Sequence, residues 1–185
     1  KPTWIDYSPL AHEKVIDLDP GLAFGTGHHP STRMCLELLQ EYTDNGPVLD
    51  LGIGSGILSI AALKLGASSI IGLDVDSTSI KAARQNLVIN GLDGNAQLIL
   101  GTLPNVKVDQ NSIQLVTANI TAHAIQQLVP EIGRVLKPEG YLIASGILDI
   151  QEEQLVRHLY NNGFETLASL AVDDWRALVL GLKNI

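Results

Sequence analysis

From Pro47 onward, short apolar runs alternate with longer segments of helical periodicity, and this alternation is the feature that most constrains the fold. A connection between two parallel strands must cross one face of the sheet, and it usually does so as a helix. A chain that repeats strand and helix in this way therefore builds a mostly parallel sheet covered by helices. The sequence predicts an α/β fold.

The individual elements can be placed by their apolar runs and by the residues that end helices. Strands are predicted over residues 47–52, 69–74, 96–101, 113–120 and 141–147. Helices are predicted over residues 57–66, 77–91, 123–140 and 150–163. Ser77 is the predicted cap of the second of these helices, and Pro130 is expected to kink the third.

The last part of the chain breaks the alternation. Two β-like runs, residues 164–172 and 175–182, are separated by Asp173 and Asp174 alone. Such a short connection joins antiparallel strands, because a parallel crossover needs a dozen or more residues. We therefore expect a seven-stranded mixed sheet with a terminal antiparallel β hairpin and with helices on both faces.

Length and composition describe an ordinary globular domain. The chain has 185 residues, of which 45% are hydrophobic and 17% charged, so one domain with a buried core is expected. No apolar run reaches the roughly eighteen residues that a membrane span requires, and the first residues lack the apolar core of a secretory signal. We expect a soluble, monomeric, cytoplasmic protein with no membrane contact.

The charge of the chain bears on its partners. A net charge of −8 repels phosphate backbones, and Lys and Arg form no basic stripe, so direct binding of nucleic acid is not expected. A basic protein or a small cationic substrate would instead be attracted at long range. The single cysteine, Cys35, has no intramolecular disulfide partner, and its helical neighbours Leu38 and Leu39 suggest a thiol in the core.

A glycine-rich loop follows the first predicted strand. In "LDLGIGSG", Gly52, Gly54 and Gly56 lie between strand and helix, where a ligand can approach the carboxyl ends of parallel strands. Asp74 ends the second strand, and a carboxylate there can accept two hydrogen bonds from ribose hydroxyls. The dinucleotide fingerprint requires its third glycine where Ile57 stands, so a nucleoside without a cradled pyrophosphate is favoured. A tight turn without any ligand is the alternative.

Asp50 precedes this loop within the same strand. A carboxylate at the carboxyl end of a strand pairs well with an ammonium group, so Asp50 is predicted near the amino group of the ligand. A helix cap or a loop anchor is the alternative.

A second glycine-rich stretch, "GLAFGTGHHPSTRMCLELL", precedes a predicted helix. Gly21, Gly25 and Gly27 would allow the backbone to approach a ligand or to close over it, and Pro30 presets the first helical turn. Free N–H groups at the start of that helix would favour a carboxylate.

Two adjacent histidines interrupt the stretch. Neighbours on an extended chain point apart and no matching ligand spacing accompanies them, so a metal site is not expected. His29 is predicted to order the loop or to line the pocket, whereas His28 is expected to be structural.

The loop spacing, the acid after the second strand and the terminal hairpin together resemble the class I S-adenosylmethionine-dependent methyltransferases. "LDPGLAFGTGHHPST", "LDLGIGSGILSIAALKLGA", "IGLDVD", "ANI" and "SGIL" narrow this to a resemblance to the PrmA family, which methylates protein eleven of the large ribosomal subunit. The resemblance runs from about Ile16 to the end and is most specific over residues 21–32. It implies a Rossmann-like class I methyltransferase fold.

The resemblance also implies a set of site residues. S-adenosyl-L-methionine is the expected cofactor, no metal is expected, and Asn119 is the expected catalytic residue, whose carboxamide oxygen would accept an N–H of the substrate amine and aim its lone pair. Residues 24–32 would fold over the cofactor. The residues expected to bind it are Phe24, Gly25, Thr26, Gly27, Thr32, Asp50, Gly52, Gly54, Gly56, Asp74, Val75 and Asn119.

The implied division of the chain is a linker or N-terminal arm over residues 1–20 and a catalytic domain over residues 21–185, with the family's N-terminal recognition domain absent. Two positions depart from the family pattern: His28 stands where Thr is common, and Thr121 gives "NIT" in place of "NIL". The sequence after Asn119 also lacks the Pro-Pro-aromatic motif of many amino methyltransferases.

The expected function is methylation of amino groups, on lysine side chains or at the N-terminal amine, of a large-subunit ribosomal protein. The alternatives are a methyltransferase for RNA or a small molecule and a non-catalytic module that binds S-adenosylmethionine. A nicotinamide oxidoreductase fits less well because of Ile57 and the hairpin.

Overall fold

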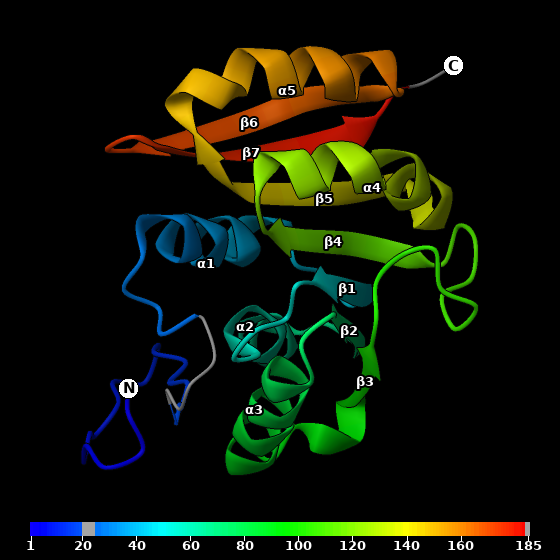
Figure 1. Ribbon diagram of the computed structural model, residues 1–185. Helices are drawn as coiled ribbons and strands as arrows, with labels where there is room; N and C mark the ends of the chain where they lie inside the picture. The colour runs from blue at the N-terminus through cyan, green and yellow to red at the C-terminus, as the bar shows by residue number, and fades with distance from the viewer. Residues whose placement is uncertain (20–24, 184–185) are drawn as a thin grey trace.

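The computed structural model describes residues 1–19 and 25–183, and within them seven strands form one sheet in the order β3-β2-β1-β4-β5-β7-β6 (Figure 1). The strands are β1 (Pro47–Leu51), β2 (Ser69–Asp74), β3 (Ala96–Leu100), β4 (Ile113–Asn119), β5 (Leu136–Leu148), β6 (Phe164–Val172) and β7 (Trp175–Leu182). β1 to β5 are parallel to one another, and β7 is antiparallel to both of its neighbours. The predicted mixed sheet is confirmed.

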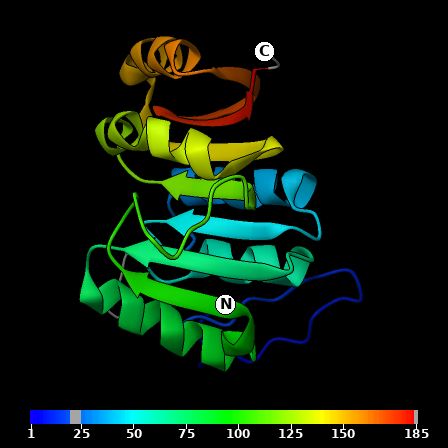
Figure 2. The same ribbon diagram turned by 90° about the vertical axis from the view of Figure 1, so that its right-hand side faces the viewer.

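Helices cover both faces of the sheet, as predicted (Figures 1 and 2). They are α1 (Pro30–Tyr42), α2 (Ile57–Leu65), α3 (Ser77–Ile89), α4 (Ala122–Val135) and α5 (Asp149–Asn161). One buried cluster joins the sheet to α1, α2 and α3, and a second cluster joins it to α4 and α5. None of the helices in the described residues is long and apolar enough to cross a membrane.

The alternation of side chains along each strand explains the two clusters. In β1, Val48 belongs to the cluster beneath α1 and α2, whereas Leu49 belongs to the cluster beneath α4. In β4, Leu115 and Val116 divide in the same way. Because successive side chains point to opposite faces, a central strand with both faces buried is apolar at most of its positions. This requirement produces the short apolar runs of the sequence.

The order of the strands places a switch point at β1. β1 pairs in parallel with β2 on one side and with β4 on the other, so that Leu51 is level with Leu73 and with Ala118. The chain leaves β1 in one direction to build β2 and β3, and later returns to add β4 on the opposite side. The carboxyl ends of β1, β2 and β4 therefore enclose the crevice in which open α/β sheets bind ligands.

The start of α3 and the end of α4 differ from the sequence prediction. The α3 cap is Asp76, whose carboxylate accepts a hydrogen bond from the Thr78 N–H at 2.8 Å, so the prediction of Ser77 is wrong by one residue. α4 ends at Val135, and β5 begins at once with Leu136, which is level with Ile113 of β4. Pairing with β4 thus converts residues predicted as helix into strand.

Pro130 lies inside α4, as expected from the sequence. A proline has no N–H to donate to the carbonyl four residues earlier, which is that of Gln126. The Gln126 carbonyl instead accepts a hydrogen bond from Nε2 of His158 in α5 at 3.1 Å. Pro130 thus leaves the Gln126 carbonyl free for a hydrogen bond that joins α4 to α5.

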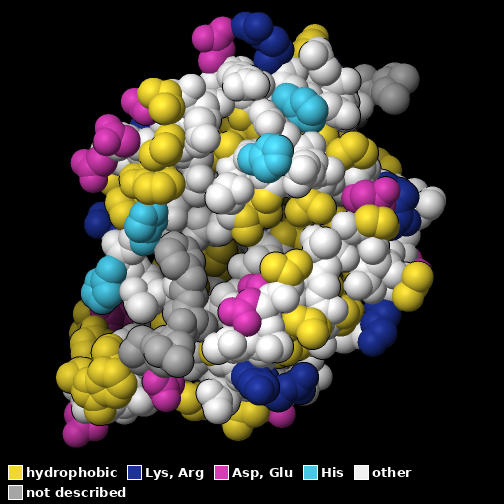
Figure 3. Space-filling model, in the orientation of Figure 1, with side chains coloured by type: hydrophobic (Ala, Val, Ile, Leu, Met, Phe, Trp, Pro, Cys, Tyr) yellow, Lys and Arg dark blue, Asp and Glu magenta, His cyan; other side chains and the backbone are white. Residues whose placement is uncertain are grey.

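The N-terminal arm, residues 1–19, is partly anchored. Its Leu18 is buried in the core and forms a β-bridge with Pro2. Further out, Trp4, Ile5, Tyr7 and Leu10 are exposed, and hydrophobic side chains gather over the arm at the lower left of Figure 3. The arm thus combines an anchored end at residue 18 with an apolar outer loop.

Gly146 and Gly163 provide a matched test of local packing. Both have a left-handed backbone, with φ of +81° and +89°, but a Cβ on Gly146 would lie 2.4 Å from the Ile120 carbonyl oxygen, whereas a Cβ on Gly163 would meet no atom within 4 Å. Gly163→Ala should reduce the free energy of unfolding by about 1–2 kcal/mol through backbone strain. Gly146→Ala should cost about 3–4 kcal/mol because the clash adds to the strain. Urea unfolding measures both, and equal losses would contradict the predicted clash.

Candidate active site

The glycine-rich loop between β1 and α2 has the conformation that its sequence predicts. Gly52, Gly54 and Gly56 have φ values of 72°, 54° and 83°. A Cβ on Gly56 would lie 3.2 Å from the backbone of Ala83, so this glycine allows α2 and α3 to pack closely. Gly52 leaves room for Ile120, whose Cγ2 would lie 2.4 Å from a Cβ there, and the Gly54 N–H faces Asp74.

Asp74 is held rigidly at the end of β2, beside this loop. Its Oδ2 accepts a hydrogen bond from the Gly54 N–H at 3.0 Å, and its Oδ1 accepts one from the Asp76 N–H at 2.9 Å. Each carboxylate oxygen can accept a further bond. The side chain can therefore hold a vicinal diol such as that of a ribose. The next residue, Val75, is 74% exposed and provides an apolar surface beside the carboxylate.

Asp50 lies deeper than the sequence suggests, with 1% of its surface exposed. Its Oδ2 accepts a hydrogen bond from Ser59 Oγ at 2.6 Å, and its Oδ1 accepts one from Thr117 Oγ1 at 2.7 Å. A ligand ammonium would have to reach a carboxylate already enclosed by these hydroxyls. Its contact with the cofactor stays a prediction, and the geometry favours the alternative, an anchor that ties β1 to α2 and β4.

Asn119, at the end of β4, lies beside α1. Its Nδ2 donates a hydrogen bond to Oγ1 of Thr32, 3.2 Å away, and Thr32 itself is fully buried. No other hydrogen bond of the Asn119 side chain links it to the described residues, so its carboxamide oxygen can accept from an incoming N–H. The structure thus joins two predicted site residues that are far apart in the sequence.

The turn after Asn119 is enclosed by two glycines. A Cβ on Gly52 would lie 2.4 Å from Cγ2 of Ile120, and a Cβ on Gly146 would clash with the Ile120 backbone. Ile120 therefore packs between the loop that follows β1 and the irregular part of β5 at Gly146. This packing fixes the position of Asn119 relative to the glycine-rich loop.

The predicted cover of the cofactor is described from Gly25 onward, and Phe24 lies outside the described residues. Gly25 and Gly27 have φ values of 102° and 87°, and Thr26 between them is exposed. Ser55 Oγ donates a hydrogen bond to the Gly25 carbonyl at 2.6 Å. The two glycine-rich stretches are therefore in direct contact.

The start of α1 differs from expectation. His29 caps the helix, since its Nδ1 accepts from the Ser31 N–H at 3.3 Å, and the Thr32 and Arg33 N–H groups donate to the His29 carbonyl. The prediction of free N–H groups for a carboxylate is therefore wrong for these residues. The His29 ring also makes an edge contact with Trp175, at a centroid distance of 4.5 Å. His29 orders the loop, as predicted.

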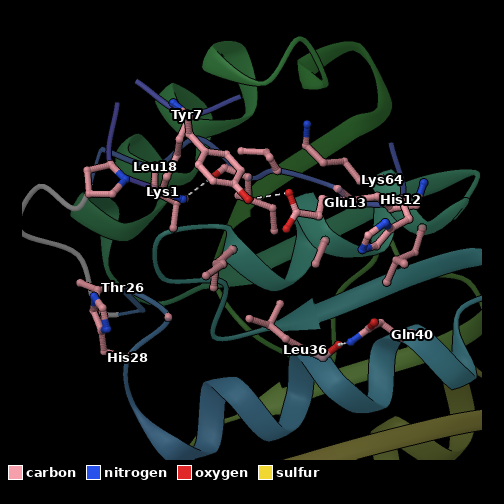
Figure 4. Close-up of a pocket in the computed structure, with 18 residues that line it drawn as sticks. Lys1, Tyr7, His12, Glu13, Leu18, Thr26, His28, Leu36, Gln40 and Lys64 are labelled. Carbon is pink, nitrogen blue, oxygen red and sulfur yellow. Dashed lines mark hydrogen bonds between the residues drawn. The ribbon is translucent and has the colours of Figure 1, made fainter. Parts of the chain in front are cut away.

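A cavity lies elsewhere, beneath the N-terminal arm and against α1 and α2 (Figure 4). Its volume is about 1110 Å³, and His28, Leu36 and Lys64 are among its lining residues. Of the predicted cofactor-binding residues it reaches Thr26 and Gly27 alone. The cavity therefore abuts the outer side of the predicted cover and is separate from the crevice at Asp74 and Asn119.

The sequence prediction missed four residues that support the site: Ser55, Ser59, Asn86 and Thr117. All are polar and buried. Ser59 and Thr117 donate hydrogen bonds to Asp50, Asn86 donates one to the Ser55 carbonyl, and Ser55, in the glycine-rich loop, donates one to the Gly25 carbonyl. Thr117 is a polar residue at a core position of an apolar strand, and this is the sequence signal that could have identified it. In residues 1–19 and 25–183, no three metal-binding side chains cluster to hold an ion.

Comparisons with known proteins agree with this geometry. Residues 1–183 match the family described as ribosomal protein L11 methyltransferase (PrmA). The chain belongs to this family. A ribosomal protein L11 methyltransferase of Syntrophomonas wolfei is 43% identical over 176 residues, which cover 95% of the chain and 57% of the relative. The corresponding protein of Desulfosudis oleivorans is 44% identical over 182 residues, which cover 97% of the chain and 60% of the relative.

A solved structure confirms the fold assignment. The crystal structure of a ribosomal protein L11 methylase from Lactobacillus delbrueckii superimposes with a TM-score of 0.91 at 33% identity, covering 99% of this chain and 93% of that chain. The resemblance to class I methyltransferases is therefore confirmed, and the family's cofactor is S-adenosylmethionine. The chain spans 57–60% of the length of the curated relatives given above.

The buried carboxyl group of Asp50 should make stability depend on pH. Burial raises its pKa from 3.8 to about 6, against the opposing hydrogen bonds from Ser59 and Thr117. The pKa of Asp50 is higher in the folded than in the unfolded state, so the folded state binds the proton more tightly. The contribution of protonated Asp50 to the free energy of unfolding is therefore complete below about pH 4 and is lost as the pH rises through about 6. Relative to Asp50→Asn, the wild type should lose about 2–3 kcal/mol of unfolding free energy across this range.

Urea unfolding of both proteins between about pH 4 and pH 7 measures this difference. Glu165→Gln, which removes an exposed carboxylate on β6, is the control. Its plot of unfolding free energy against pH should run parallel to that of the wild type. Parallel curves for the wild type and Asp50→Asn would contradict the assignment.

Proposed function

We propose that this chain is the catalytic part of an S-adenosylmethionine-dependent methyltransferase that modifies amino groups, on lysine side chains or at the N-terminal amine, of a large-subunit ribosomal protein. Family membership supports the reaction class and the substrate. The observation that carries the proposal is the convergence of Asp74, the glycine-rich loop and Asn119 at the switch point of the sheet. The division into an arm over residues 1–20 and a catalytic domain over 21–185 is part of the same proposal.

The residues at the switch point fit the proposed cofactor. The Asp74 carboxylate, fixed by two backbone N–H groups, can accept bonds from both ribose hydroxyls. Val75 offers an apolar surface next to it for the adenine ring, and the exposed Gly52 presents backbone without a side chain at this edge of the sheet. When bound, S-adenosylmethionine supplies a methyl group activated by a sulfonium.

Asn119 is the proposed orienting residue. Thr32 fixes the amide nitrogen, so the carboxamide oxygen can accept an N–H from the substrate amine and direct the nitrogen lone pair toward the cofactor. Correct alignment of two reacting groups can contribute several kcal/mol to the barrier. The amine must first lose a proton, which burial in a site of low dielectric constant favours by lowering its pKa.

The charge of the chain supports a cationic substrate. A net charge of −8 attracts a basic protein and raises the rate of encounter at low salt. The same charge disfavours RNA as the substrate.

Asp74→Ala should weaken the binding of S-adenosylmethionine by roughly 10- to 100-fold, because it removes the proposed ribose contact and releases the Gly54 N–H. Isothermal titration calorimetry measures the affinity. The matched control is Asp76→Asn, two residues away, which keeps an acceptor at the α3 cap and should stay within about twofold of wild type. Unchanged affinity in Asp74→Ala would remove the proposed ribose site.

Transfer itself can be tested by mass spectrometry of a purified large-subunit ribosomal protein incubated with the chain and S-adenosylmethionine. The wild type should add methyl groups to amines, and Asn119→Ala should slow the transfer by roughly 100-fold or more. Asn95→Ala, an exposed asparagine outside the site, is the control. Methylation of added ribosomal RNA in place of protein would refute the proposal, as would cofactor binding with no transfer even when a family recognition domain is supplied.

A further inference from the structure

Asn86 of α3 and Asn90, which directly follows that helix, bind the backbone of the N-terminal arm in the same way. Asn90 accepts a hydrogen bond from the Asp17 N–H at 3.1 Å and donates one to the Asp17 carbonyl at 2.7 Å. Asn86 does the same with Asp19, at 2.8 and 3.3 Å. The two asparagines are four residues apart and so lie on one face of the helix. Each carboxamide therefore pairs with both the N–H and the carbonyl of one residue of the arm.

Asn86 makes one contact that Asn90 does not. Its Nδ2 also donates to the carbonyl of Ser55, in the glycine-rich loop, at 2.9 Å. The second bond of the Asn90 amide goes to the carbonyl of Asn86, within the same helix. Asn86 is 1% exposed, and a carboxamide at such depth is costly unless its hydrogen bonds are made. The arm is thus joined to the loop through Asn86.

Ser55 continues this connection on the other side. Its Oγ donates a hydrogen bond to the Gly25 carbonyl at 2.6 Å. A Cβ on Gly25 would lie 2.9 Å from the same Ser55 Oγ. Asp19 and Gly25 are the described residues on either side of residues 20–24. Both are therefore tied to Ser55, Asp19 through Asn86 and Gly25 directly. Ser55 lies between Gly54, which binds Asp74, and the start of α2.

We infer that Asn86 is a positioning residue for cofactor binding, which fixes the glycine-rich loop at Ser55 and holds the chain on both sides of residues 20–24 against it. This inference rests on the proposed cofactor site. Asn86 itself touches the loop and not the crevice at Asp74, so it acts through Ser55. Preorganisation of a loop improves affinity because less ordering remains to be done on binding. Loss of Asn86 should therefore weaken cofactor binding more than its effect on stability would suggest.

The two asparagines provide a matched pair of variants. Asn86→Ala and Asn90→Ala each remove a two-bond clamp on the arm, whereas Asn86→Ala alone breaks the bond to the loop. Asn86→Ala should weaken binding of S-adenosylhomocysteine, the stable product, by roughly tenfold in calorimetry, and Asn90→Ala by less than about twofold. Amide hydrogen exchange should accelerate at Asp19 in the first variant and at Asp17 in the second.

Ser55→Ala provides an independent measurement, because it leaves Asn86 intact and removes the bond to Gly25. It should also weaken product binding, and it keeps the hold on Gly25 testable if Asn86→Ala does not fold. Equal affinities for the two asparagine variants would overturn the positioning role of Asn86. Wild-type affinity in Ser55→Ala would overturn the role of the bond to Gly25, and neither result bears on the proposed function. A wild type that binds no S-adenosylhomocysteine would overturn the proposed function, and the positioning role with it.

Discussion

The pairing of β1 between β2 and β4 is the constraint on which the remaining architecture depends. Parallel pairing on both sides places β1 in the interior of the sheet and requires its two neighbours to be reached by connections in opposite directions. The residues that follow these three strands therefore meet at one edge of the sheet. Gly52, Asp74 and Asn119, separated by up to 67 residues in the sequence, belong to one site for this reason.

Hydrogen bonds between buried polar groups stabilise this edge of the sheet. Asp50 joins β1 to β4 and α2 through the hydroxyls of Thr117 and Ser59, and Ser55 and Asn86 join the glycine-rich loop to the N-terminal arm. Each of these groups would be costly in the core if it were unpaired. Because their partners come from different elements, the hydrogen bonds specify one arrangement of those elements and not merely a compact state.

Much of the fold could be predicted from the sequence because its elements are strongly periodic. The predicted bounds of β1, β2 and the terminal hairpin agree with the structure to within a residue, since apolar runs and the Asp173–Asp174 turn mark their ends. The boundary between α4 and β5 was not, because Leu136 becomes strand through pairing with Ile113, a contact that local sequence does not encode. Among the predicted site residues, Asp50 is enclosed and Asn119 meets Thr32, and neither contact can be derived from spacing along the chain.

The order of the last two strands has a consequence for how the chain acquires its structure during synthesis. β7 lies between β5 and β6, although it follows both in the sequence. When residues 164–172 leave the ribosome, the neighbour they require has not yet been made, and β5 still presents an open edge. The sheet is complete only when β7 pairs with both β5 and β6. Until then, the unpaired strand edges can associate with other chains.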